Sequence, residues 1–489
     1  MTSIKRNLAA LLLAGAAALP AFGQADLTRM VWLGDSIGAG VSNGCLSKHT
    51  QIDSIPAIVA RQAGAADFQQ PIIEEPGQGG CLVLTSLAPS FSNKPSTGVP
   101  SNLNVARPYN NLSIPGCAIT DYLRATTASE ARPGFCAGLI DLVLRNQALH
   151  IGSMVDQAVA LNPTFVVLED VGNNYLGAVL SGTVIDGVTV QPVQTVTDSY
   201  TQALQKLSAK QRNGFVSTNV NVTQIPFATT LPPVLTSGGQ VVLVNGQPIP
   251  LLGPKGCPAG VPACPVPAGT LVTLQAAGFL PTGFGIPCAA APSLPNCNKP
   301  LPDSANTYGP GTPGVLLYPD EVALLQSRHD QYNAAIRAAA AATGYKVFDT
   351  DAAFDELKAG VHFGGLTVNA AFLTGGAFSY DGIHLTSIGY AWLADKVVQF
   401  INANFGNNIP RVDMSVFLFN GNTTGIMGSP IIPAMRTQDV YDAAARIFTP
   451  EYGKALMRSY APQLIPALDE IPVSREEPVQ HRRDAIEIH

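Results

Sequence analysis

Short apolar runs in this chain end in polar turns, and segments with helical spacing separate them. We expect strands near residues 31–33, 111–114, 164–168, 214–218 and 346–349. Apolar residues at helical spacing predict helices near residues 53–63, 153–161, 196–210, 316–342, 387–401 and 439–460. Short strands that alternate with helices favour a parallel sheet with helices on both faces, which is an α/β fold.

Three of these strands lead into turns that contain glycine. The turns are Gly34-Asp35-Ser36, Pro115-Gly116 and Gly172-Asn173-Asn174. Ligands bind outside the carboxyl ends of the strands in such sheets, and all three turns fall there. A hydroxyl on a glycine-lined turn can serve as an exposed nucleophile. Taken alone, however, the first turn is more typical of a helix start with Asp35 or Ser36 as the N-cap.

The charge balance excludes two classes of protein. Hydrophobic residues make up 46% of the chain and charged residues 13%, and the formal net charge is -6. A disordered acidic chain would be far less apolar, and binding to a polyanion needs a basic face. We therefore expect a globular protein without a nucleic-acid partner.

The first 23 residues have the pattern of a secretory signal peptide. Lys5 and Arg6 precede an apolar run over residues 8–19, and Ala21-Phe22-Gly23 is a small-x-small cleavage site. The apolar run is too short to span a bilayer. We expect a mature chain that begins near Gln24, is secreted or periplasmic, and has no stable membrane anchor.

The eight cysteines all follow this segment. An even number of cysteines in an oxidising compartment indicates disulfide bonds, and no C-x-x-C pair supports a zinc site of the usual spacing. Pairing of neighbours, Cys257 with Cys264 and Cys288 with Cys297, is our hypothesis among many connectivities. A second hypothesis is that Cys117 forms a disulfide that stiffens the turn at Gly116.

The strand–helix alternation stops between residues 229 and 314. This region is rich in proline and glycine, holds four cysteines, and contains a hairpin signal around Asn245-Gly246. We interpret it as a disulfide-rich insertion in a core made of residues 24–228 and 315–405. The insertion is a candidate lid, in which the apolar residues 271–280 could face a substrate. Residues 406–489 then form a C-terminal extension with a charged tail.

Ser36 would need a base, because a free hydroxyl is a poor nucleophile at neutral pH. Of the seven histidines, His384 alone has a carboxylate three residues before it, Asp381, in a loop that enters a helix. Asp381 could orient the imidazole, and His384 could take the proton of Ser36 and pass it to the leaving group. Taken alone, an Asp-x-x-His pattern usually marks a surface loop or a helix start.

A tetrahedral intermediate would also need donors for its oxyanion. The backbone N–H groups of Ser36 and Gly116 are candidates, together with a side-chain amide of Asn173 or Asn174. Each of these residues has an ordinary structural explanation by itself. Their order along the chain, at the ends of successive strands, favours the functional interpretation.

The motifs resemble those of the GDSL esterases, also called SGNH hydrolases. The first motif is Gly34-Asp35-Ser36-Ile37-Gly38-Ala39-Gly40, and the last is Asp381-Gly382-Ile383-His384-Leu385-Thr386. Ser113-Ile114-Pro115-Gly116 resembles the glycine block of this family, and Gly172-Asn173-Asn174 its Gly-x-Asn block. The resemblance implies a flavodoxin-like three-layer sandwich and a secreted serine esterase or lipase that acts on carboxylic esters.

By the same resemblance, Ser36 is the nucleophile, His384 the base and Asp381 the orienting acid. Gly116 and Asn174 join Ser36 in the oxyanion hole, and no cofactor or metal is implied. The family usually has Gly-x-Asn-Asp where this chain ends in Tyr175, so Asn173 stays open as the amide donor. The expected substrate is a small-molecule, lipid or acylated-saccharide ester.

Three alternatives use the same residues. Gly34-Asp35-Ser36-Ile37-Gly38 also fits the G-x-S-x-G motif of α/β-hydrolases, but that fold places several strands before its nucleophile. An acyltransferase would use the same site with an alcohol or sugar as acceptor. A catalytically silent protein that binds a glycan or a lipid would keep the fold, although the intact Ser36, Asp381 and His384 argue against it.

Overall fold

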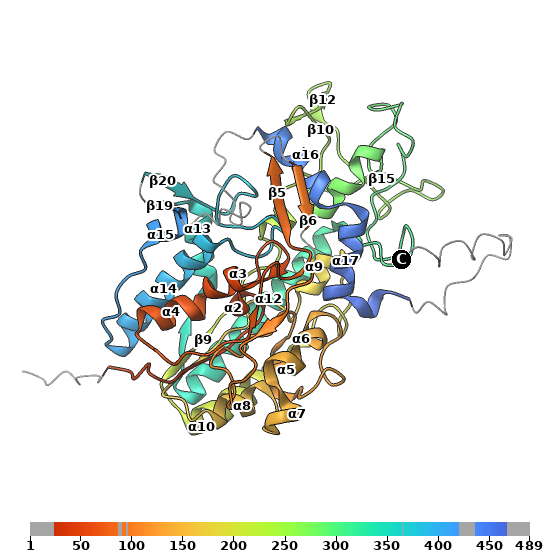
Figure 1. The fold of residues 1–489 in the computed structure, drawn as a ribbon. Coiled ribbons are helices and arrows are strands. Elements are labelled where there is room, and N and C mark those ends of the chain that lie inside the picture. The colour runs from red at the N-terminus through yellow and green to blue at the C-terminus, as the bar shows by residue number, and fades with distance from the viewer. Residues whose placement is uncertain (1–23, 87–89, 94–95, 364, 420–435, 467–489) are drawn as a thin grey trace, which may run out of the picture.

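The computed structural model describes residues 24–86, 90–93, 96–363, 365–419 and 436–466 (Figure 1). The predicted signal peptide and the charged tail after residue 473 lie outside the described residues. Among the described helices, none combines the length and the apolar character that crossing a bilayer requires.

A parallel sheet of four strands forms the centre of the molecule. The strands lie in the order β1 (Met30–Leu33), β8 (Phe165–Leu168), β9 (Gly214–Ser217) and β18 (Lys346–Phe348). Every residue of β1, β8 and β9 is buried, which explains why the sequence shows continuous apolar runs there. The predicted parallel sheet is confirmed.

Residues 110–114 run along the free side of β1 without forming a full strand. The N–H of Leu112 donates to the carbonyl of Trp32 (2.8 Å), and the N–H of Ile114 donates to that of Gly34 (2.9 Å). The chain thus leaves β1 to one side, crosses back, and continues at β8 on the other side. The strand order reverses at this point, and open α/β sheets bind their ligands at such a crevice.

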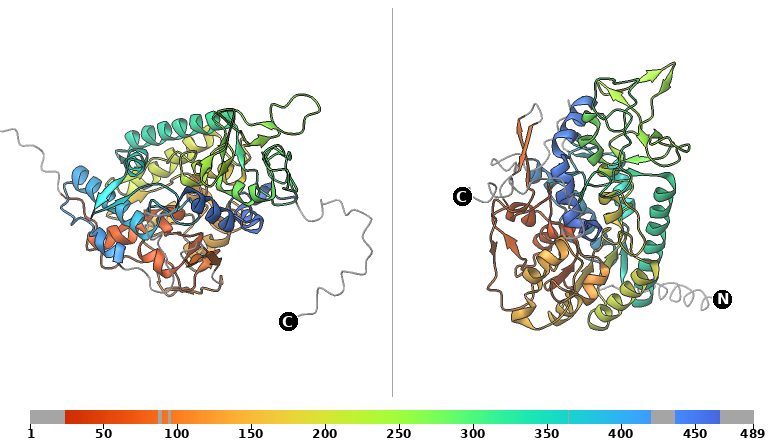
Figure 2. Two further views of the ribbon diagram at one scale, coloured as in Figure 1. Left: turned by 90° about the horizontal axis from the view of Figure 1, so that it is seen from above. Right: turned by 90° about the vertical axis from the view of Figure 1, so that its right-hand side faces the viewer.

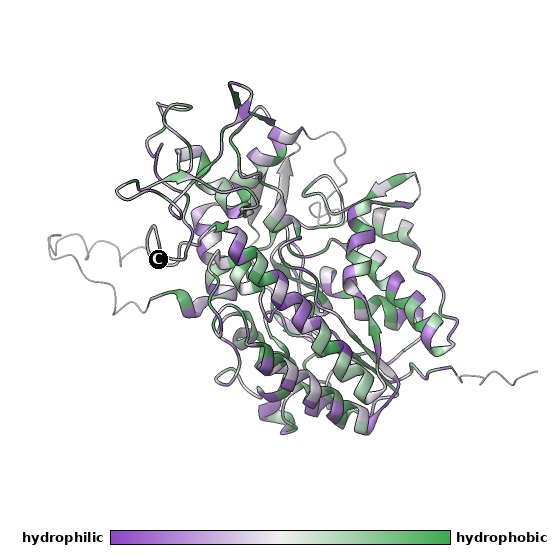
Figure 3. Ribbon diagram, turned by 180° about the vertical axis from the view of Figure 1, so that it is seen from behind, coloured by the Kyte–Doolittle hydropathy of each residue, from purple (hydrophilic) through white to green (hydrophobic). Residues whose placement is uncertain are grey.

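Helices cover both faces of the sheet, so the predicted three-layer α/β sandwich is confirmed (Figure 2). The helices α8 (Met154–Ala160), α10 (Val193–Lys210) and α12 (Pro319–Thr343) pack together on one side, and α4 (Ile55–Gln62) packs with α14 (Ser387–Phe405) on the other. Seen from behind, hydrophilic and hydrophobic segments alternate along the helices (Figure 3), as expected of helices with one buried side.

The remaining elements are short and connect this core. The helices are α2 (Ser36–Ala39), α3 (Lys48–Ile52), α5 (Ile119–Arg124), α6 (Phe135–Leu144), α7 (Asn146–Leu149), α9 (Leu176–Ser181), α11 (Pro226–Thr229), α13 (Thr350–Ala359) and α15 (Met414–Phe419). Two-stranded pairs are β2 (Cys45–Leu46) with β4 (Gln78–Gly79), β3 (Ile72–Ile73) with β7 (Pro100–Ser101), β5 (Leu82–Ser86) with β6 (Ser90–Asn93), and β19 (Val361–Phe363) with β20 (Leu366–Val368).

Residues 229–314 are bound to the core by backbone pairing and side-chain packing. Strand β16 (Leu271–Val272) of the insertion pairs with β17 (Leu316–Leu317) of the core. The predicted hairpin forms from β12 (Leu243–Val244) and β13 (Gln247–Pro248), and both proposed disulfides, Cys257–Cys264 and Cys288–Cys297, are confirmed. Two further short pairs complete it: β10 (Thr236–Ser237) with β11 (Gln240–Val241), and β14 (Leu252–Gly253) with β15 (Cys264–Pro265).

The prediction of one helix over residues 439–460 is wrong. The structure has two helices, α16 (Thr437–Ile447) and α17 (Pro450–Tyr460). Pro450 disfavours helical geometry at Thr449 and has no N–H to donate. Thr449 instead caps the second helix, because its hydroxyl accepts from the N–H of Tyr452 at 3.3 Å. In Figure 2 these two blue helices run between the green insertion and the orange helices α5 and α6.

Candidate active site

Ser36 lies directly after β1, at the start of α2. The preceding residue Asp35 caps this helix through a hydrogen bond from the N–H of Ile37 (2.9 Å), as the local pattern predicted. Glycine is required at position 34 because a Cβ atom there would lie only 2.5 Å from the hydroxyl of Ser113. The close approach of Ser113 to the turn therefore depends on Gly34.

Asp381 and His384 form a buried pair in the loop that precedes α14. The Nδ1 atom of His384 lies 2.8 Å from the Oδ2 atom of Asp381. The other oxygen of Asp381 accepts from the backbone N–H groups of Ile383 and His384, each at 2.9 Å. The i, i+3 spacing thus allows one compact loop to fix both the carboxylate and the imidazole.

Two residues outside the sequence motif also bind Asp381. The hydroxyl of Ser379 donates to Oδ1 at 2.9 Å, and the N–H of Gly44 donates to Oδ2 at 2.7 Å. Burial alone would raise the pKa of Asp381, but the neighbouring His384 and the hydrogen bonds hold it well below its ordinary value. Asp381 is therefore an ionised carboxylate over the working pH range of most enzymes.

Ser36 and His384 line one apolar cavity of about 80 Å³, which we call the acyl cavity. The Nε2 atom of His384 is buried and has no hydrogen-bond partner among the described residues. The walls come mainly from the carboxyl edge of the sheet and from α13 and α14: Val171, Leu176, Val220, Val222, Ile225, Phe354, Leu357, Phe378, Trp392 and Leu393. The described residues that line it include none from the insertion, whose residues Val272, Leu274 and Ala276 are packed in the core instead.

The turn at Gly116 is fixed by covalent and polar contacts. Gly116 has φ = +78°, and a Cβ atom there would lie 2.9 Å from that of Phe135, so glycine is required. The predicted disulfide at Cys117 is confirmed and joins it to Cys136. The side-chain amide of Asn173 donates to the carbonyl of Cys117 at 3.0 Å, which holds the second and third glycine-containing turns together.

Asn173 and Asn174 point in different directions. Asn173 lines the acyl cavity with Ser36 and His384, and one hydrogen of its amide is used by Cys117. The amide of Asn174 instead donates to the buried carboxylate of Asp170 at 2.6 Å. The structure thus brings Asn173, and not the expected Asn174, to the cavity beside Ser36.

Three buried carboxyl groups lie around the base of the turns. Asp35 accepts from the N–H of Val171 at 3.0 Å and so links the first turn to the third. Glu169 accepts from the indole of Trp32 at 2.8 Å. Burial, with the charge of Asp35 second, raises the pKa of Asp170 to about 7 and that of Glu169 well above its ordinary value. Sequence reasoning missed this cluster, because acidic residues after apolar runs look like ordinary turn residues.

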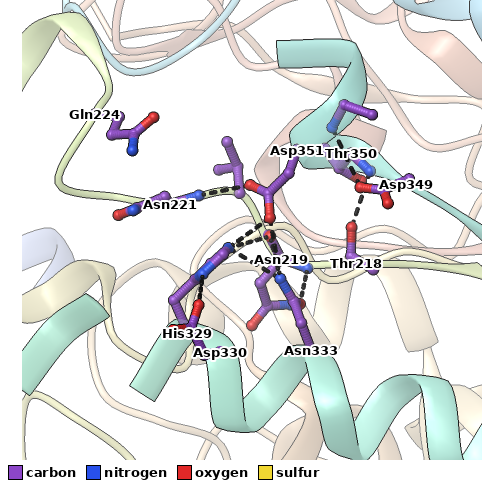
Figure 4. A network of polar contacts seen from close by, with 12 residues as sticks. Thr218, Asn219, Asn221, Gln224, His329, Asp330, Asn333, Asp349, Thr350 and Asp351 are labelled. Carbon is purple, nitrogen blue, oxygen red and sulfur yellow. Dashed lines mark hydrogen bonds and ion pairs between the residues drawn. The ribbon is translucent and has the colours of Figure 1, made fainter. Parts of the chain in front are cut away.

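A second histidine cluster lies farther along the same edge of the sheet (Figure 4). His329 of α12 lies 2.7 Å through Nε2 from Asp351 of α13, and 2.9 Å through Nδ1 from Asp330. Asn333 donates to Asp351 at 3.3 Å and accepts from the backbone of Asn219 at 2.7 Å. The cluster therefore joins two helices to the end of β9, and both nitrogens of the ring are engaged.

One group of metal-ligand type occurs among the described residues: Cys117, Asp121 and Cys136. Both sulfurs form the disulfide that fixes the Gly116 turn, so no thiolate is available there as a ligand.

Comparison with known proteins gives one match. A family model described as GDSL-like Lipase/Acylhydrolase matches residues 30–397. This range includes all three glycine-containing turns, the insertion and the Asp381–His384 loop. No curated protein and no solved structure matches the chain.

Proposed function

The chain belongs to the GDSL-like lipase/acylhydrolase family, and on that premise we propose that it is an exported serine esterase that hydrolyses carboxylic esters. Ser36 is the nucleophile, His384 the general base, and Asp381 the residue that orients the histidine. One observation carries the proposal: Ser36 and the unpartnered side of His384 face one cavity, while Asp381 holds the other side of the ring.

In the first half of the reaction, the hydroxyl of Ser36 attacks the ester carbonyl and its proton passes to Nε2 of His384. The ionised Asp381 stabilises the imidazolium that forms. Collapse of the tetrahedral intermediate breaks the bond to the alcohol, which leaves with the proton from His384. Water then attacks the acyl-Ser36 ester by the same steps and releases the acid.

The oxyanion of each intermediate would accept hydrogen bonds from the backbone of Ser36 and Gly116 and from the amide of Asn173. We assign the amide to Asn173 because it lines the acyl cavity and has a second N–H beyond the one that binds Cys117. The disulfide at Cys117 supports this arrangement by holding the Gly116 turn in place before the substrate arrives.

The acyl part of the ester would occupy the acyl cavity, whose walls are almost entirely apolar. Each buried methylene contributes about 0.8 kcal/mol. Catalytic efficiency should therefore rise along a series of acyl chains and stop rising when the cavity is full.

Four disulfides support export to an oxidising compartment. They pin the Gly116 turn, the insertion and the segment from Cys45 to Cys81. Growth of the full-length chain in a bacterial host, followed by mass analysis of the periplasmic and medium fractions, tests whether cleavage occurs near Gly23.

The catalytic proposal is tested by hydrolysis of p-nitrophenyl esters with acyl chains of increasing length. Ser36→Ala should lower kcat by about 10⁶-fold, because it removes the nucleophile. Ser129→Ala replaces an exposed serine and should leave kcat unchanged. A fluorophosphonate probe should label the wild type at Ser36. Full hydrolysis by Ser36→Ala, or a folded wild type that the probe does not label, would overturn the proposal.

A further inference from the structure

His384 also lines a second cavity. It has a volume of about 260 Å³ and is bounded by the Asp381–His384 loop, by Gly44 and Gly80, and by the helices α16 and α17. We call it the C-terminal cavity. Its lining residues between 446 and 460 all lie beyond residue 397, where the family match ends. This wall therefore lies outside the part of the chain that the family model matches.

The two cavities differ in chemistry. The walls of the acyl cavity are apolar apart from Asp35, Ser36, Asn173, Thr350 and His384. In contrast, α16, α17 and the turn between them bring polar side chains to the C-terminal cavity: Arg446, Thr449, Glu451, Tyr452, Ser459 and Tyr460. An apolar chain is thus favoured in the acyl cavity and a hydroxylated group in the C-terminal cavity.

One buried polar atom of the C-terminal cavity wall, apart from the catalytic Nε2 of His384, has no partner among the described residues. It is the hydroxyl of Tyr452, a residue that is only 9% exposed. Buried polar groups in native proteins are nearly always paired, with protein, water or ligand. An unpaired hydroxyl on a residue of the cavity wall points to a ligand that supplies the missing hydrogen bond.

The hydroxyl of Tyr452 lies next to the catalytic loop. A Cβ atom on Gly44 would be 3.2 Å from this hydroxyl, and the N–H of Gly44 donates to Asp381 at 2.7 Å. Burial, and after it the charge of Asp381, raises the pKa of Tyr452 well above its ordinary value. The phenol is therefore protonated and can donate a hydrogen bond.

The direction of the reaction assigns the cavity to one part of the ester. His384 must give its proton to the departing alcohol, so the alcohol oxygen comes within reach of His384 while the acyl chain extends from the opposite side of the carbonyl carbon. Because His384 lines both cavities, an acyl chain in the acyl cavity leaves the C-terminal cavity to the alcohol. We propose that the C-terminal cavity binds the alcohol part of the ester, and that Tyr452 binds a further hydroxyl on that alcohol. This inference rests on the proposed esterase function. It names the substrate class as an ester between an apolar acid and a polyhydroxylated alcohol.

The test compares two esters of the same acid whose alcohols have three carbons each. Propyl butyrate carries no free hydroxyl, whereas glyceryl 1-butyrate carries two. We expect the wild type to prefer the glyceryl ester in kcat/KM. Tyr452→Phe keeps the ring and removes the hydroxyl, and it should reduce this preference by about three- to tenfold, the effect of one hydrogen bond.

The matched control is Tyr441→Phe, which removes a hydroxyl from α16, away from the cavity, and should leave the preference as in the wild type. As a second variant, Ala455→Phe adds a ring at an exposed position on the cavity wall. It should raise the KM for the glyceryl ester more than that for the propyl ester, even if Tyr452→Phe does not fold.

The outcomes separate the two proposals. An unchanged preference in folded Tyr452→Phe, or equal effects of Ala455→Phe on both esters, would overturn the assignment of the alcohol site while Ser36→Ala still abolishes both reactions. Hydrolysis of both esters by Ser36→Ala would overturn the esterase proposal itself.

Discussion

His384 and His329 lie at the carboxyl edge of the same sheet, and an aspartate holds each of them at a hydrogen-bonding distance below 3 Å. His384 shares a cavity with residues of the loops after β1 and β8, whereas His329 contacts Asn219 after β9 and Asp351 after β18. The two differ at the second ring nitrogen. In His384 it is buried and has no partner among the described residues, whereas in His329 it binds Asp330.

This difference separates a residue that can transfer a proton from one that connects elements of the fold. An imidazole with one nitrogen fixed and the other directed to a cavity can accept a proton from a bound reactant. An imidazole that lies between two carboxylates has no ring nitrogen available to a reactant. The two carboxylates instead stabilise its protonated form within the fold. A histidine–aspartate pair is therefore not sufficient to identify a catalytic site.

The largest expected effect comes from making the same substitution at both histidines. His384→Gln should lower kcat for a p-nitrophenyl ester by about 10⁶-fold, because the base is lost. His329→Gln should leave kcat within about threefold of the wild type, because its effect is on packing away from Ser36. Steady-state kinetics at 25 °C, with folding checked by circular dichroism, measure both. Equal losses in kcat would mean that the second cluster takes part in the chemistry.

Asn173 and Asn174 repeat the comparison at neighbouring residues. Asn173→Ala removes an amide from the acyl cavity and should lower kcat by about 10²-fold or more, with little change in KM. Asn174→Ala removes a partner of the buried Asp170 and should act mainly on the free energy of unfolding, by about 1–3 kcal/mol. Kinetics and urea unfolding of both variants decide the assignment. A larger loss of kcat in Asn174→Ala would return the oxyanion role to that residue.

The sequence was sufficient for features whose parts lie close together along the chain. The Asp381–His384 pair follows from an i, i+3 spacing in one loop. The position of Ser36 follows from the apolar run that ends at Leu33. The parallel sheet was predictable because strands buried on both faces have continuous apolar runs.

Other features depended on contacts between distant residues. Asn173 and Asn174 are the same residue type at adjacent positions, and only the folded backbone determines which of their side chains points to the cavity. A sequence pattern does not contain that information. Gly44 and Ser379 support Asp381 through hydrogen bonds that only the folded chain brings together. Tyr452 lies in a segment that was predicted as one uninterrupted helix, so its approach to Gly44 could not be foreseen.

The smallest expected effect concerns stability at the second cluster. Burial opposes the charged form of His329, but the hydrogen bonds and charges of Asp351 and Asp330 outweigh it and raise its pKa above the ordinary 6.5. A raised pKa of a histidine stabilises the folded state fully below the unfolded-state value near 6.5. This contribution is then lost as the pH rises through the folded-state pKa. The folded chain therefore binds the proton of His329 more tightly than the unfolded chain does, and the folded state loses this stabilisation when the pH rises above the folded-state pKa.

His329→Gln cannot be protonated, so it should lower the free energy of unfolding by about 1 kcal/mol at pH 6 and by less at pH 9. Urea unfolding of both proteins at the two pH values measures the difference, and His362→Gln, at an exposed histidine, is the control. A difference that stays constant or grows toward pH 9 would show that the His329 charge does not stabilise the junction of α12 and α13. In that case His329 would still differ from His384 as a structural residue from a catalytic one. Its contribution to stability, however, would come from the packing of its ring and not from its charge.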